Sequence, residues 1–264
     1  MEHYFGFAQE LLQSGRAGEG SAYGADSLYD YAVQFQHDAV FYVDVARQCR
    51  GKVLDVGCGS GRMLLPLAEA GIACAGMDLS PEMLRLAAAK LDAYGYQVPL
   101  HQGDMEAFHL GERFAGIVIP YQSMMYMTSP QRRRRALQCM AAHLQPGGLL
   151  AFDFDCSEQE VGDSLPYLAL QGVHPFHGHV MLQVVQTRIF ADGRRLLNQI
   201  NYDLTEPVRI TVQASEESSC SVEEMREHLQ QAGFRIVGLY QDYERTPYQA
   251  GPECVVLAEK VVEG

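Results

Sequence analysis

A glycine-rich turn between a candidate strand and a candidate helix is the part of this sequence best suited to hold a ligand. Residues 53–56 form a short apolar run that contains Asp55, and the segment Gly57-Cys58-Gly59-Ser60-Gly61 follows it. Glycine permits a sharp turn and lets a ligand approach bare backbone. The exposed N–H groups at the start of the following helix favour a carboxylate or a phosphate. By itself this motif is weak evidence for a ligand site, and the groups that follow the neighbouring strands strengthen it.

Acidic or polar groups follow each of the next three candidate strands. Asp78 ends the strand expected at 72–77, and Gly103-Asp104-Met105 follows the strand expected at 98–102. Pro120, Tyr121, Gln122 and Ser123 follow the strand expected at 114–119. An acid at position 78 can accept hydrogen bonds from both hydroxyls of a ribose, and an acid after the third strand suits an adenine amino group. Because parallel strands end at one edge of a sheet, these groups should share one crevice.

The elements that must position these groups alternate between strand and helix from residue 51 to 155, which predicts βαβ units and a parallel sheet. Helices are expected at 63–70, from Ser80 onward and at 131–144, with a fifth strand at 148–154. Residues 157–172 are expected to be partly helical. Strands at 180–190, 195–204 and 207–214 follow, with an Asp192-Gly193 hairpin turn. A capped helix at 221–232 and strands at 234–242 and 253–262 close the pattern.

This pattern predicts three domains. A helical cap covers 1–50, with an amphipathic helix over 28–48, and a core covers 51–155 and 221–264. An insertion with antiparallel strands covers 156–220 and is expected to act as a lid.

Composition and charge exclude several classes of function. The 264 residues carry 20 Lys and Arg against 33 Asp and Glu, a formal net charge of −13. An acidic surface repels nucleic acid and anionic lipid and favours a neutral or cationic small molecule. The sequence shows neither a run of about 20 apolar residues nor a secretory signal. Its seven scattered cysteines predict reduced thiols, so we expect a cytoplasmic protein without membrane or nucleic-acid partners.

Basic residues and two histidines are expected at the surface. The run from Arg132 to Arg135 lies in a predicted helix, where its side chains should spread around the cylinder as a solvated face. Aromatic residues that could stack RNA bases do not alternate with it. His109 and His143 are expected to be surface residues.

The motifs together resemble those of class I S-adenosylmethionine-dependent methyltransferases. The resemblance rests on residues 53–61 (VLDVGCGSG), 76–83 (GMDLSPEM), 103–105 (GDM) and 144–148 (LQPGG). The inserted strands resemble the small-molecule branch, such as glycine and amino-sugar N-methyltransferases. The resemblance implies an α/β fold, a Rossmann-like, mostly parallel sheet of seven strands. It also implies S-adenosylmethionine as cofactor, S-adenosylhomocysteine as product, and a small-molecule substrate methylated at nitrogen or oxygen.

The resemblance assigns site residues position by position. Asp55 and the glycine turn, Cys58 included, would hold the methionine part of the cofactor, and Asp78 the ribose. Leu79, Met83, Gly103, Asp104 and Met105 would lie around the adenine, with Pro120 also at the cofactor. Tyr29 and Tyr31 resemble N-terminal aromatic residues that fold over the cofactor in this branch; Tyr29 is also a substrate candidate, and Tyr31 is equally well a core residue. The remaining substrate candidates are Tyr121, Gln122, Ser123 and Tyr126, for which ordinary packing at a helix start is the alternative, and His179, for which a polar rim of the lid is the alternative.

Methyl transfer is an in-line displacement in which much of the catalysis can be positioning. An amine needs only to be neutral and aimed, whereas a hydroxyl or an acidic carbon needs a base. Candidate catalytic groups are His174, His177, Tyr126 and Asp155, the last preferred over Asp153 if Asp153 faces the other side of its strand. The histidine cluster could also be a polar rim or a metal site, and no metal is assigned to it.

Two other functions remain open from the sequence. A dinucleotide-dependent dehydrogenase prefers G-x-G-x-x-G, whereas the third glycine here follows after one residue. The same fold could also use S-adenosylmethionine for cyclase or lyase chemistry that releases methylthioadenosine, or as an effector. The expected oligomeric state is a monomer or a homodimer.

Overall fold

The computed structural model describes residues 3–21, 37–173 and 178–262. The chain divides into two compact units. The core unit comprises Gln36–Glu158 and Ser219–Gly264, and the inserted unit comprises Met1–Phe35 and Gln159–Ser218. The units differ from the predicted domains at the N-terminus, because residues 36–50 belong to the core and residues 1–35 to the insertion.

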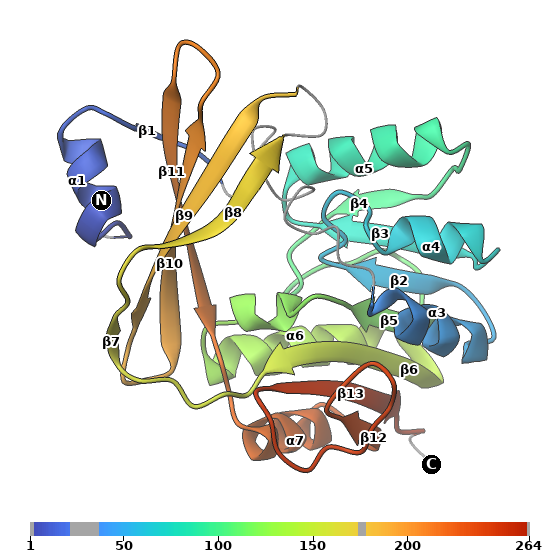
Figure 1. Ribbon diagram of the computed structural model, residues 1–264. Coiled ribbons are helices and arrows are strands. Elements are labelled where there is room, and N and C mark those ends of the chain that lie inside the picture. Colours follow the sequence, from blue (N-terminus) through green and yellow to red (C-terminus); the bar gives the residue numbers. More distant parts are fainter. Residues whose placement is uncertain (1–2, 22–36, 174–177, 263–264) are drawn as a thin grey trace. The chain divides into compact units, whose positions relative to one another are not determined.

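The core unit contains a seven-stranded sheet in the order β12-β13-β6-β5-β2-β3-β4 (Figure 1). The parallel strands are β2 (Val53–Val56), β3 (Cys74–Asp78), β4 (Leu100–Gln102), β5 (Phe114–Ile119) and β6 (Leu144–Asp155). Antiparallel β13 (Glu253–Lys260) and β12 (Phe234–Tyr240) complete the sheet. The strand order reverses between β2 and β5, which is where open α/β sheets bind ligands. The predicted Rossmann-like, mostly parallel sheet is confirmed.

Helices pack on both faces of this sheet, in two separate hydrophobic clusters. The helices α3 (Ala39–Gln48), α4 (Leu64–Glu69) and α5 (Pro81–Ala93) bury Phe41, Leu67 and Leu91 in one cluster. On the other face, α6 (Pro130–His143) and α7 (Val222–Gln231) bury Leu137 and Leu229. Of the helix predicted over 28–48, the structure describes α3, and residues 28–36 lie outside the described residues.

Serine caps fix where three of these helices begin. Ser80, Ser129 and Ser221 each accept a hydrogen bond through the side-chain oxygen from the backbone N–H three residues on. Such caps satisfy N–H groups that lack a partner within the helix. The predicted helix starts at Ser80 and Ser221 are confirmed.

The inserted unit is built on a mostly antiparallel sheet in the order β1-β11-β10-β9-β7, with β8 also paired to β9 and with β1 parallel to β11. Its strands are β1 (Gly18–Glu19), β7 (Gly162–Asp163), β8 (Tyr167–Val173), β9 (Val180–Ile189), β10 (Arg194–Asp203) and β11 (Arg209–Ser218). The hairpin at Asp192-Gly193 is confirmed, with Gly193 at φ 80°. The helical prediction for 157–172 is wrong, because this stretch forms β7 and β8 on the edge of β9, a long-range pairing that local sequence does not encode.

The two faces of the inserted sheet differ in chemistry. On one face Ile200 and Val212 pack against Ala8 and Leu11 of α1 (Gly6–Gln13). Side chains alternate between faces along a strand, so the opposite face carries a layer of amides and hydroxyls: Gln183, Gln199, Asn201, Thr211 and Gln213. Gln183 donates to Asn201 Oδ1 at 2.9 Å.

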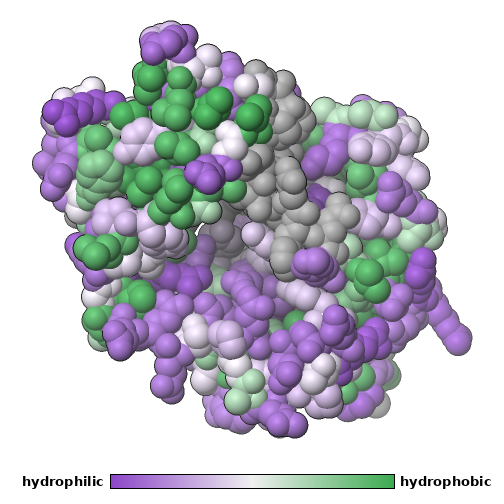
Figure 2. Space-filling model, in the orientation of Figure 1, coloured by the Kyte–Doolittle hydropathy of each residue, from purple (hydrophilic) through white to green (hydrophobic). Residues whose placement is uncertain are grey.

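The surface also differs between the units. In Figure 2 the apolar residues gather mainly over the strands of the inserted unit, and the surface of the core unit in this view is largely hydrophilic. Exposed apolar side chains of β8 include Tyr167, Leu168 and Val173. In the described part of the chain, every helix is too short or too polar to span a membrane.

Candidate active site

The glycine turn joins β2 to α4 and bends in a way that only glycine adopts easily. Gly57, Gly59 and Gly61 have φ angles of 73°, 52° and 83°. A Cβ placed on Gly57 would lie 3.1 Å from Ser123 Oγ, and one on Gly61 would lie 3.2 Å from Ala87 Cβ. Side chains here would therefore be strained and would crowd the loop after β5 and helix α5. The turn leaves bare backbone beside Ser123.

Asp78 ties the end of β3 to this turn. Its Oδ2 accepts the Gly59 N–H at 2.8 Å and its Oδ1 accepts the Ser80 N–H at 2.8 Å. The Asp78 carbonyl oxygen also accepts the Gly103 N–H at 3.0 Å, which joins the loop after β4 to the same place. Burial raises the pKa of Asp78, although these backbone hydrogen bonds oppose the shift.

Asp55 lies in β2 beneath the turn and is only 1% exposed. Neither of its carboxyl oxygens has a hydrogen-bond partner among the residues that the structure describes. Burial raises the pKa of Asp55 to about 8; Arg62 opposes this shift, and Asp78 and Asp38 add to it. A buried acid without a hydrogen-bond partner is costly to ionise, so burial favours the neutral form of Asp55 although the charge of Arg62 acts against it.

The loop after β5 holds two consecutive left-handed residues, Tyr121 and Gln122, with φ angles of 59° and 57°. Asp153 of β6 accepts both of their N–H groups, at 2.9 and 2.8 Å, and also the hydroxyl of Tyr42. Burial raises the pKa of Asp153 to about 6, against the hydrogen bonds from Tyr42 and Gln122. Non-glycine residues occupy this conformation at a cost, and the carboxylate offsets that cost.

Asp153 and Asp155 are both buried in β6. Being two residues apart on a strand, they face the same side. The preference for Asp155 as the catalytic candidate required Asp153 to face the opposite side, so that preference loses its basis. Asp155 accepts hydrogen bonds from the N–H and hydroxyl of Ser157, at 2.8 and 2.5 Å. Asp153 is the residue that contacts the loop of substrate candidates.

The matching family is that of the methyltransferase domain, which covers residues 53–148. The chain carries a methyltransferase domain. The resemblance predicted from the motifs is confirmed over these residues, which include the glycine turn.

Similar proteins include sugar N-methyltransferases. The dTDP-3-amino-3,4,6-trideoxy-alpha-D-glucopyranose N,N-dimethyltransferase of Streptomyces venezuelae is 35% identical over 101 residues, which are 38% of this chain and 41% of that protein. The match thus spans about two fifths of the relative. The sugar N-methyltransferase KedS8 of Streptoalloteichus is 26% identical, with a TM-score of 0.71 over 93% of this chain and 98% of that one. An S-adenosylmethionine-dependent methyltransferase of Clostridium acetobutylicum shares the fold, with 17% identity and a TM-score of 0.76 over 89% of this chain and 95% of that one.

The methyltransferase domain brings several of the predicted residues together. Asp78 contacts Gly59 directly, Gly103 contacts Asp78, and Ser123 lies against Gly57. Met105 also reaches Gly57, with its Cε 4.0 Å from a Cβ placed there. Asp104 is exposed and accepts the Glu106 N–H at 2.9 Å.

Other predicted residues lie elsewhere or outside the described chain. Tyr29, Tyr31, His174 and His177 fall outside the described residues. His179 belongs to the inserted unit, where its Nδ1 lies 2.7 Å from Asp203 Oδ2.

Further residues of the predicted cofactor and substrate sets are placed by the core unit. Leu79 is exposed, whereas Cys58, Met83 and Pro120 are buried. Tyr126 ends the short 3-10 helix η1 (Ser123–Tyr126).

Sequence reasoning missed an ion pair beside the glycine turn. Arg62 donates to both oxygens of Asp38, at 2.7 Å each, and its guanidinium lies 5.2 Å from the ring centroid of Tyr121. Asp38 is fully buried at the start of α3. An arginine directly after Gly61 was the available signal, although its partner could not be identified without the fold.

Two surface predictions are wrong. Arg133 is 3% exposed and donates to Glu224 Oε1 at 2.6 Å and to the Met127 carbonyl at 3.1 Å, because α6 turns this side chain toward α7. His143 is buried against Phe108, with ring centroids 4.2 Å apart. His109 is exposed, as predicted.

Proposed function

We propose that this protein is an S-adenosylmethionine-dependent methyltransferase that methylates an amine nitrogen of a small metabolite, of the amino-sugar class. The names of the relatives support nitrogen and sugars as acceptor classes. The observation that carries the proposal is the buried carboxyl of Asp55, which precedes the glycine turn and has no hydrogen-bond partner among the described residues.

The residues present fit the cofactor by their chemistry. Asp55 has no hydrogen-bond partner among the described residues, and the ammonium group of the methionine part would supply a charged donor. Asp78 uses each oxygen for one backbone N–H, and a carboxylate oxygen can accept a second hydrogen bond. Ribose hydroxyls can therefore bind Asp78 without displacing Gly59 or Ser80. Leu79, Met83, Asp104 and Met105 are proposed to lie around the adenine, with Cys58, Gly103 and Pro120 also at the cofactor.

Once bound, S-adenosylmethionine supplies an electrophilic methyl group on its sulfonium. The protein's task is then to hold a neutral amine in line with that methyl group and to exclude water. The rigid loop from Tyr121 to Ser123 is proposed to aim the acceptor, since Asp153 fixes its backbone and Ser123 lies beside Gly57. Tyr126, Asp155, His174 and His177 are proposed as groups that accept the proton released from the amine, with Tyr29, Tyr31 and His179 closing the site.

The polar face of the inserted sheet supports a polyhydroxylated acceptor. Asn201 Nδ2 is buried without a hydrogen-bond partner among the described residues. Amide side chains offer both donors and acceptors, as sugar hydroxyls do. We propose that this face contributes the recognition of the sugar, and that the insertion acts as a lid.

The site of action is proposed to be the cytoplasm, with the chain acting as a monomer or a homodimer and without nucleic-acid or membrane partners. All seven cysteines are free, which suits a reducing compartment. The net charge of −13 disfavours anionic polymers.

Calorimetric titration with S-adenosylmethionine and S-adenosylhomocysteine tests the cofactor, with Asp78→Asn as the variant. The wild type should bind both, and the variant should bind about tenfold more weakly because Asn accepts fewer hydrogen bonds from ribose hydroxyls. Asp92→Asn, at an exposed acid of α5 outside the proposed site, is the matched control and should bind within about threefold of the wild type. No binding by the wild type would contradict the proposal.

Product analysis with a panel of amino sugars tests the reaction. S-adenosylhomocysteine together with a methylated amine supports the proposal. Release of methylthioadenosine would instead establish cleavage of the aminocarboxypropyl arm, the lyase or cyclase alternative.

A further inference from the structure

The arginine run at the start of α6 violates an elementary rule of helix electrostatics. Residues 132–135 are four consecutive arginines, and α6 begins at Pro130. The first turn of a helix carries unpaired N–H groups and the positive end of the helix dipole, so cations there are unfavourable. Local rules are broken mainly where a tertiary contact or a function compensates. The contacts of Arg132 identify such a compensation.

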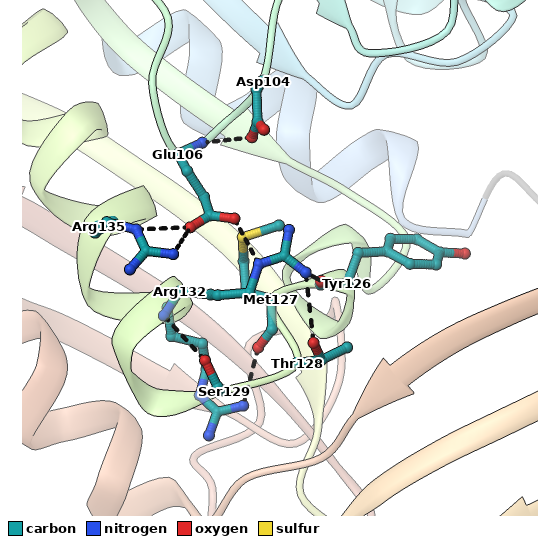
Figure 3. Close-up of polar contacts among 9 residues, drawn as sticks. Asp104, Glu106, Tyr126, Met127, Thr128, Ser129, Arg132 and Arg135 are labelled. Atoms are coloured by element: carbon teal, nitrogen blue, oxygen red, sulfur yellow. Dashed lines mark hydrogen bonds and ion pairs between the residues drawn. The ribbon is translucent and has the colours of Figure 1, made fainter. Parts of the chain in front are cut away.

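Arg132 connects two loops that are separate in sequence (Figure 3). Its Nε donates to Glu106 Oε1 at 2.5 Å, in the turn after β4. Its Nη1 donates to the Tyr126 carbonyl at 3.1 Å and to Thr128 Oγ1 at 3.4 Å, at the end of η1. One planar guanidinium therefore joins the turn after β4 to the C-terminal end of η1, in a geometry that lysine cannot reproduce.

Glu106 is the anionic half of this connection. Its side chain is 10% exposed and also accepts hydrogen bonds from Arg135, including one to Oε2 at 2.8 Å. Burial opposes ionisation, but the hydrogen bonds from Arg132 and Arg135 outweigh it and lower the pKa of Glu106. The Glu106 N–H also donates to Asp104, so the ion pair and Asp104 belong to one rigid turn.

We propose that Arg132 and Glu106 are positioning residues that couple the turn carrying Asp104 and Met105 to η1, which carries Ser123 and Tyr126. The consequence for catalysis rests on the proposed function, in which the first loop binds the adenine and the second aims the acceptor. Breaking the connection then weakens cofactor binding and also misaligns the acceptor, although neither side chain is a catalytic residue.

Arg135 provides a matched control. It pairs with the same Glu106 from the same helix, but its side chain is 57% exposed and its described hydrogen bonds go to Glu106 alone. Arg135→Gln removes an equal charge without removing the connection to Tyr126. Arg132→Gln removes both the charge and the connection to Tyr126, whereas Arg132→Lys keeps the charge without the planar guanidinium.

Hydrogen exchange of the protein without added ligand tests the coupling directly. In Arg132→Gln, amides of 103–108 and of 123–128 should both exchange about tenfold faster, while the rest of the core unit keeps its protection. Arg135→Gln should leave 123–128 at the wild-type rate. Equal exchange of 123–128 in the two variants, or a uniform loss of protection, would overturn the proposal.

Steady-state kinetics tests the catalytic consequence. Arg132→Gln should raise KM for S-adenosylmethionine and lower kcat, each about five- to tenfold, whereas Arg135→Gln should change both less than about twofold. Arg132→Lys should recover less than half of the kcat that Arg132→Gln loses, because lysine lacks the planar guanidinium that reaches both loops. An unchanged kcat in Arg132→Gln would overturn the coupling. A wild type that binds no S-adenosylmethionine would contradict the proposed function, and hydrogen exchange would still decide whether the two loops are coupled.

Discussion

Two buried aspartates on either side of β5 have opposite surroundings. Asp55 of β2 and Asp153 of β6 are 1% and 2% exposed, on strands that both pair with β5. Asp153 accepts three hydrogen bonds from the protein, and its pKa is raised to about 6. Asp55 has no such partner in the described chain, and its pKa is raised to about 8.

The difference separates a structural role, which we expect for Asp153, from a ligand-binding role, which we expect for Asp55. A buried carboxylate that the protein itself satisfies stabilises a conformation, here the left-handed backbone of Tyr121 and Gln122. A buried carboxyl that the protein leaves without a partner lowers stability when it ionises. Under the proposed function, the ammonium group of the ligand pairs with this carboxyl. We therefore expect substitution of Asp153 to affect mainly folding, and substitution of Asp55 to affect mainly the binding of the proposed cofactor.

Asp153→Ala should have the largest effect. It removes the acceptor of two partly buried N–H groups and of the buried Tyr42 hydroxyl, and we expect a loss of about 3 kcal/mol or more in the free energy of unfolding. Urea denaturation measures it. Asp155→Ala, which removes the acceptor of the hydrogen bonds from Ser157, should lose less than about 1.5 kcal/mol. Equal losses in the two variants would remove the special role of Asp153.

Asp55→Asn should have a smaller effect, and of a different kind. Because burial raises the pKa of Asp55 well above its unfolded value, the wild type must take up a proton at this carboxyl to fold at pH 7, a cost that the neutral amide avoids. Asp55→Asn should therefore not lower the free energy of unfolding. Affinity for S-adenosylmethionine should fall about tenfold or more, since the amide cannot pair with an ammonium group. Calorimetry measures the affinity and urea denaturation measures the free energy of unfolding, both on the same preparation. A large loss of stability with unchanged affinity would reverse the comparison.

The pH dependence of stability should show the smallest effect. A carboxyl whose pKa is raised on folding stabilises the protein fully below its unfolded pKa, and this contribution is lost as pH rises through the folded pKa. Asp55 should therefore lower the free energy of unfolding between pH 7 and 8, by at most about 1.4 kcal/mol per pH unit. His228, whose pKa burial lowers, acts in the opposite sense below its ordinary pKa, and so the test is kept above pH 7.

The measurement is the difference between the wild type and Asp55→Asn in urea denaturation at pH 7 and at pH 8. Asp55→Asn should flatten the slope in this range. Parallel pH profiles for the two proteins would mean that Asp55 is already ionised in the folded protein.

The sequence by itself determined the features that depend on neighbouring residues. The glycine turn, the serine caps at Ser80 and Ser221, the hairpin at Asp192-Gly193 and the alternation of strand and helix each depend on a few adjacent side chains. Asp78 followed from the same local pattern, because an acid at the end of a parallel strand has one edge of the sheet available to it. This is why the fold and the contact between Asp78 and the glycine turn were predictable.

The tertiary structure alone decided the contacts between distant segments. Arg132 meets Glu106 across 26 residues, Tyr42 meets Asp153 across 111, and β8 pairs with β9 rather than forming a helix. A charge or a buried acid has the same appearance in sequence whether its partner is water, an arginine or a strained backbone. Which partner it finds depends on packing between elements, and that choice determined the outcomes for Arg133, His143 and Asp153.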